Sequence, residues 1–142
     1  MPILFILDHH PKNHSSFKEE GGQWPSHCVA GTHGGDIHED LKKFVKQECC
    51  FFKGCEPAVE QYSGWQAKTS VGESLDQRLK ALGVENTIVM GIATEYCVRA
   101  TCLDLLSAGF KVKLCQRALA YVDEQAHRQT IDELKSALVV ID

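Results

Sequence analysis

The chain has 142 residues and a mass of 15.8 kDa, with 15 lysines and arginines against 19 aspartates and glutamates and a formal net charge of −4. This length allows one compact domain with a substantial core, so we expect a single domain over residues 1–142. The charge balance, without a basic run, argues against nucleic acid or membrane partners. A small molecule is the expected partner.

The cysteine content and the start of the chain predict a cytoplasmic protein. The seven cysteines are an odd number and Cys49 and Cys50 are adjacent, so reduced thiols are the better expectation than a disulfide framework. The apolar segment Met1–Leu7 is too short to cross a bilayer and lacks the features of a signal peptide.

Apolar runs alternate with amphipathic stretches along the chain. The runs predict buried parallel strands, and the stretches predict helices that end near Gly83 and Gly109. We expect strands over 3–7, 49–52, 87–91, 111–115 and 138–141. Helices are expected over 36–46, 74–82, 96–108 and 123–136, and an irregular region over 9–35. This order predicts an α/β fold of three layers, α/β/α, with a mostly parallel sheet and the functional groups at the carboxyl ends of its strands.

The irregular region contains a candidate metal site. Asp8 and His10 are two residues apart on an extended segment, so their side chains can converge on one divalent ion, and His27 can complete the set. His14 is a candidate fourth ligand. Two histidines and one carboxylate leave ligand positions open for substrate or water. The alternative is that this His-rich loop is solvated surface.

A candidate nucleophile and its helper follow two other predicted strands. Cys97 stands where a turn after Gly91 enters a helix, and there the helix dipole can stabilise a thiolate while the Ala93 and Cys97 amides form an oxyanion hole. Lys53 ends a strand, where its ammonium can lower the pKa of the thiol. The alternative for Cys97 is a small buried apolar residue, which we prefer for the other cysteines. The alternative for Lys53 is a solvated surface lysine.

Several short motifs follow one another along the chain: Asp8-x-His10-Pro11-x-Asn13-His14-x-Ser16-Phe17, Trp24-Pro25-x-His27-Cys28, Gly31-Thr32-x-Gly34, Lys53-Gly54, Tyr62-Ser63-Gly64 and Gly91-Ile92-Ala93-Thr94-x-x-Cys97. In this order and spacing they resemble the nicotinamidase/pyrazinamidase family of isochorismatase-like cysteine hydrolases, which have a Rossmann-like fold. The resemblance implies an amidohydrolase that converts nicotinamide to nicotinic acid and ammonia through a cysteine thioester. It makes Cys97 the nucleophile and Lys53 its electrostatic helper, and it places the metal on Asp8, His10 and His27.

The resemblance also implies how the substrate is held. The metal, which can be zinc, iron or manganese, would bind the pyridine nitrogen directly or through water. Trp24, Tyr62 and Tyr96 would surround the ring. A cis peptide bond that does not involve proline is expected at Ile92–Ala93.

The sequence departs from the family at its start. Family members begin with an additional central strand that carries the general-base aspartate, and only seven residues precede Asp8 here. We expect a fragment of a longer protein; the alternatives are a strand from another chain, a loss of catalysis, or replacement by the last strand with Asp142. Omission of a central strand would leave its two neighbours without ladder hydrogen bonds.

Two other functions compete with nicotinamide hydrolysis. One is an isochorismatase-like hydrolase of another small amide, and the other is a catalytically impaired small-molecule binding protein. A homo-oligomer is expected from the resemblance and from the incomplete sheet.

Overall fold

The computed structural model describes residues 1–137 and 139–141, so Asp142 lies outside the described residues. The chain divides into two compact units: the first comprises Met1–Gln61 and Gln66–Leu75, and the second comprises Tyr62–Trp65 and Asp76–Asp142. The single domain over residues 1–142 stays a prediction. Within the described part of the chain, no helix is both long and apolar enough to cross a bilayer.

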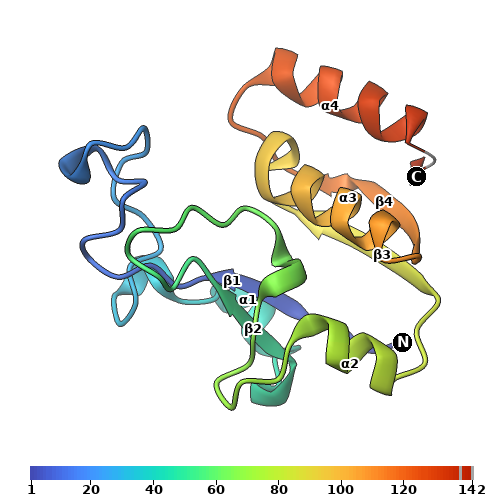
Figure 1. The fold of residues 1–142 in the computed structure, drawn as a ribbon, viewed down its shortest axis with the longest axis horizontal. Helices are drawn as coiled ribbons and strands as arrows, with labels where there is room; N and C mark the ends of the chain where they lie inside the picture. Colours follow the sequence, from blue (N-terminus) through green and yellow to red (C-terminus); the bar gives the residue numbers. More distant parts are fainter. Residues whose placement is uncertain (138, 142) are drawn as a thin grey trace. The chain divides into compact units, whose positions relative to one another are not determined.

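The first unit is built on two parallel strands, β1 (Phe5–Asp8) and β2 (Cys50–Lys53) (Figure 1). Their register places Asp8 opposite Lys53, so both side chains leave the sheet at its carboxyl edge. The long loop between the strands folds back on β1, where the His10 amide bonds to the Cys28 carbonyl at 3.0 Å. Phe51 in β2 is fully buried and anchors the core of this unit.

The helix expected over 36–46 is wrong for most of its length. Only the single turn α1 (Glu39–Lys42) is α-helical, and none of its residues is buried. The apolar residues Leu41 and Phe44 in this segment are 46% and 53% exposed. Because an isolated helix of this length is marginal without a packed face, the segment stays mostly irregular.

The second unit holds three parallel strands in the order β3 (Asn86–Gly91), β4 (Lys111–Leu119) and β5 (Val140–Ile141). Helix α3 (Arg99–Ser107) lies against strands β3 and β4, with α4 (Glu124–Ser136) alongside it (Figure 1). An ion pair between Arg99 and Glu133, at 2.5 and 2.7 Å, joins the two helices. Helix α2 (Leu75–Ala81) starts where the chain passes from the first unit to the second.

All the paired strands are parallel and alternate with helices, which confirms the α/β class. The strands form two sheets, a pair β1–β2 in the first unit and a triplet β3–β4–β5 in the second. Among the described residues, β1 pairs only with β2 and β3 only with β4, so each keeps one edge without a strand partner. On β3, Ile88 and Met90 are 46% and 55% exposed.

Candidate active site

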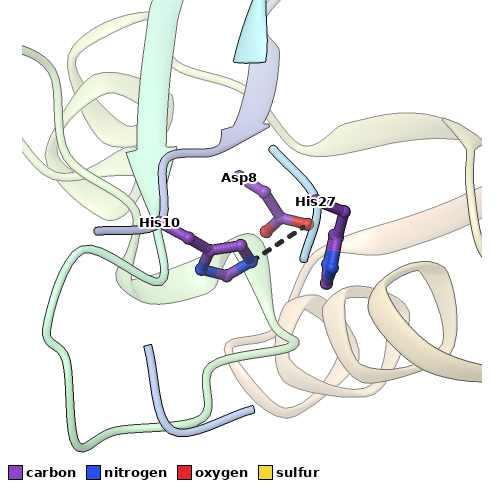
Figure 2. Close-up of side chains that lie close together, drawn as sticks. All are labelled: Asp8, His10 and His27. Carbon is purple, nitrogen blue, oxygen red and sulfur yellow. Dashed lines mark ion pairs between the residues drawn. The ribbon is translucent and has the colours of Figure 1, made fainter. Parts of the chain in front are cut away.

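Asp8, His10 and His27 form the expected cluster in the first unit. One ligand atom from each lies within 4.8 Å of the other two, and Figure 2 shows the three side chains turned toward one another. Asp8 ends strand β1, and its Oδ2 lies 3.8 Å from His10 Nε2. Fully buried Phe17 packs against the rings of His10 and His27, with ring centroids 5.6 and 5.4 Å away. The donor set and its spacing fit a divalent metal ion.

Main-chain carbonyls fix the tautomers of both histidines. His10 Nδ1 lies 2.9 Å from the Gly54 carbonyl, and His27 Nδ1 lies 2.8 Å from the Pro25 carbonyl. Because a carbonyl oxygen only accepts hydrogen bonds, each Nδ1 carries the proton and each Nε2 keeps a lone pair. Burial lowers the pKa of His10, which also favours the neutral ring. Both imidazoles are therefore held in the form that binds a metal.

The structure gives His14 a different environment from its neighbours. Its Nδ1 accepts from Ser16, whose hydroxyl lies at 2.7 Å and whose amide lies at 3.3 Å, and its Nε2 donates to the Val59 carbonyl at 3.1 Å. The side chain is fully buried and packs against His10 with the ring centroids 4.3 Å apart. With both nitrogens engaged, His14 supports the cluster as a packing partner and offers no lone pair to an ion.

Lys53 is buried at the end of β2, with only 5% of its surface exposed. Its ammonium donates to Asp8 Oδ1 in a short contact and to the Gln61 carbonyl at 3.1 Å. A buried ammonium needs such partners to remain charged. Lys53 is therefore a fixed cation beside the candidate metal ligands, and the alternative of a solvated lysine is wrong.

Cys97 lies in the second unit, on a π-helical turn over Thr94–Val98 that leads directly into α3. The peptide bond Ile92–Ala93 before this turn is cis, as expected from the resemblance. The Tyr96 and Val98 amides both bond to the Ala93 carbonyl, at 3.1 and 3.2 Å. The Cys97 side chain is half-buried on this turn, two residues before α3 begins at Arg99.

Other thiols have surroundings that disfavour a thiolate. Burial raises the pKa of Cys102 to about 12, and burial also raises the pKa values of Cys50 and Cys55. None of the seven cysteines, all of which lie in the described part of the chain, forms a disulfide. Cys102 is fully buried in α3, as expected for a small apolar residue.

The three aromatic candidates form two separate contacts. Trp24 lies beside the candidate metal ligand His27 in the first unit, with ring centroids 6.4 Å apart. Tyr62 and Tyr96 pack on each other in the second unit, with centroids 5.3 Å apart. Trp24 is therefore near the candidate metal ligands. Tyr96 lies on the same turn as Cys97, and Tyr62 packs against it.

Sequence reasoning missed two residues that shape these sites. Gln61 bonds to both Lys53 and Gly54, and nothing in its local sequence distinguishes it from a surface glutamine. Glu95 holds the connection after β4, because its Oε1 accepts from the Val122 and Asp123 amides at 2.8 Å each. Its position two residues before Cys97 is the only sequence signal for that role.

Comparisons with known proteins identify the family of the chain. The isochorismatase domain family matches residues 1–142 of the chain. Nicotinamidase of Escherichia coli is 36% identical, and the match covers 79% of this chain and 60% of that protein. The solved structure of Pyrococcus horikoshii pyrazinamidase in complex with zinc is 38% identical with a TM-score of 0.88, covering 99% of this chain and 74% of that one. The solved structure of PnC1 from L. infantum in complex with nicotinate is 33% identical with a TM-score of 0.85, and the match covers 96% of this chain and 69% of that chain.

Proposed function

Because the chain belongs to the nicotinamidase family of isochorismatase-like hydrolases, we propose that it hydrolyses nicotinamide to nicotinic acid and ammonia. The chain spans 60% of the length of the Escherichia coli relative, so the activity is proposed for the chain as a part of such an enzyme. The observation that carries the proposal is the cluster of Asp8, His10 and His27 with Lys53 paired to Asp8. This set combines a metal-binding group with a fixed cation, which suits polarisation of a small amide.

In the proposed reaction Cys97 is the nucleophile. The thiol gives up its proton, its thiolate attacks the carboxamide carbon, the carbon–nitrogen bond breaks, and the leaving nitrogen takes up that proton and departs as ammonia. Water then hydrolyses the thioester to nicotinic acid and restores the thiol. The Ala93 and Cys97 amides would hold the oxyanion, and Lys53 would stabilise negative charge.

The remaining residues would bind and orient the substrate. Asp8, His10 and His27 would hold a divalent ion, which can be zinc, iron or manganese. When bound, the ion would supply a ligand position for the pyridine nitrogen, directly or through water. Trp24, Tyr62 and Tyr96 would contact the ring.

A second candidate function is supported by the state of Asp8. Its carboxylate already accepts a hydrogen bond from Lys53 and belongs to the candidate metal site. It is therefore a poor candidate for the base that takes the thiol proton. Without a positioned base, the rate would fall by a factor of about 10² to 10⁴. The alternative is therefore a small-molecule binding protein with impaired turnover.

The compartment and assembly are also part of the proposal. The seven cysteines, none of which forms a disulfide among the described residues, support a reducing compartment, the cytoplasm. A homo-oligomer is supported by strand β3, which has neither charge nor proline on an edge that lacks a strand partner among the described residues. Unprotected edges of this kind favour pairing with another chain.

The test is ammonia release from nicotinamide by the 142-residue chain with added Zn²⁺ or Mn²⁺, beside Cys97→Ala and Asp8→Asn. We expect release that is absent in Cys97→Ala and strongly reduced in Asp8→Asn. Nicotinamide binding that needs Asp8, without any release of ammonia, would favour the binding protein. Absence of both binding and turnover would refute the nicotinamide assignment.

A further inference from the structure

We propose that Gln61 is a positioning residue that fixes the end of strand β2 and, through Gly54, orients the metal ligand His10. The inference rests on the proposed metal site. All the groups involved lie in the first unit. The role is separate from metal binding, since both oxygens of Gln61 already accept hydrogen bonds, one from Lys53 and one from Gly54.

Gln61 holds two consecutive residues with two different atoms. Its main-chain carbonyl accepts from Lys53 Nζ at 3.1 Å, and its side-chain Oε1 accepts from the Gly54 amide at 3.0 Å. Gly54 is buried, so its amide would be costly to leave without an acceptor. The side chain of Gln61 therefore specifically secures Gly54.

Gly54 in turn determines where the His10 ring lies. Its carbonyl accepts from His10 Nδ1 at 2.9 Å, and a Cβ built on Gly54 would lie 2.4 Å from His10 Cε1. The backbone of Gly54 thus both bonds to the ring and touches it. A small displacement of Gly54 would move His10 Nε2, the atom that faces Asp8.

The two contacts of Gln61 respond differently to substitution. Any residue at position 61 keeps a main-chain carbonyl for Lys53, and Lys53 also keeps its ion pair with Asp8. Only the Gly54 amide loses its acceptor when the side-chain oxygen is removed. A substitution at Gln61 therefore tests the path from Gly54 to His10 with little direct effect on Lys53.

The experiment measures Zn²⁺ affinity of the full chain by competition with a chromophoric chelator. We expect Gln61→Leu to weaken binding about 10-fold, the lower range for partners that orient metal ligands. Gln61→Glu keeps an acceptor at the same reach and should restore most of the affinity. Gln66→Leu removes an exposed glutamine of the same unit and should bind as the wild type does.

Asp8→Asn separates failure of the inference from failure of the proposed site. Zn²⁺ binding lost in Asp8→Asn but unchanged in Gln61→Leu would overturn the role of Gln61 and leave the metal site standing. Unchanged binding in Asp8→Asn would overturn the metal site and the inference with it. A purely structural role would lower the melting temperature without changing affinity. Should Gln61→Leu fail to fold, Gln61→Asn, one methylene shorter, is expected to show the same loss, and unchanged affinity there would refute the inference.

Discussion

The substitution Gly54→Ala should disturb the candidate metal site, although Gly54 itself supplies no ligand atom. Gly54 has a φ of +64°, and an added Cβ would lie 2.4 and 2.6 Å from Cε1 and Nδ1 of His10. These distances are too short for a real contact, and the ring is packed between Phe17 and His14. The backbone at Gly54 and the His10 ring must therefore move apart.

The magnitude follows from two contributions. An L-residue in the left-handed region costs about 1–2 kcal/mol, and forcing an extra methyl group into a packed site costs about 1–3 kcal/mol. We expect the free energy of unfolding to fall by about 2–5 kcal/mol from these combined. Displacement of His10 should also weaken Zn²⁺ binding by about 10- to 100-fold.

Gly72→Ala is the matched control, because Gly72 has a φ of +88° but nothing within 4 Å of an added Cβ. It should show the backbone cost of about 1–2 kcal/mol with unchanged Zn²⁺ affinity. Urea unfolding and chelator competition on the two variants measure both quantities. Equal Zn²⁺ affinity in Gly54→Ala and Gly72→Ala would refute the idea that contact with Gly54 positions His10.

Three other predictions concern pH and packing. Burial lowers the pKa of His10 in the folded chain, so the unfolded chain takes up the proton first and stability should be lost as the pH falls below the ordinary value of 6.5. Urea unfolding in the presence of a chelator between pH 7.5 and 5 measures this, and His10→Asn should reduce the slope. Phe51→Ala removes a fully buried side chain and should lower the free energy of unfolding by about 3–5 kcal/mol, measured by urea unfolding. A decrease below about 1 kcal/mol would contradict the place of Phe51 in the core. Glu95→Ala leaves the Val122 and Asp123 amides without their acceptor and should cost about 1–3 kcal/mol, whereas Glu95→Asp should recover part of that loss in thermal unfolding.

The order of strands and helices could be predicted because apolar runs and helix-ending glycines are local signals. The boundaries were less certain, since β4 continues to Leu119, four residues beyond the apolar run that marked it. The helix around Leu41 and Phe44 was wrongly predicted, because periodicity shows where apolar residues are but not whether a partner surface exists. The expected strand over 138–141 is described only at Val140–Ile141.

The candidate metal ligands could be predicted because Asp8 and His10 share one short extended segment and a motif placed His27 beside them. The role of Gln61 could not be predicted, since it depends on a loop that returns to the end of β2. The environment of His14 likewise depends on the distant Val59 carbonyl. Spacing in sequence identifies side chains that can converge, whereas the hydrogen bonds that orient them come from tertiary structure.

The proton on each histidine ligand is held by a main-chain oxygen, from Gly54 for His10 and from Pro25 for His27. A carbonyl is present whatever side chain the residue carries, so no substitution can delete these acceptors directly. Most side-chain substitutions around the candidate metal site should therefore leave the tautomers of His10 and His27 unchanged. The hydrogen bonds depend instead on the position of the main chain. Insertions or deletions near Pro25 and Gly54 should therefore be tolerated far less well than surface substitutions in the same loops.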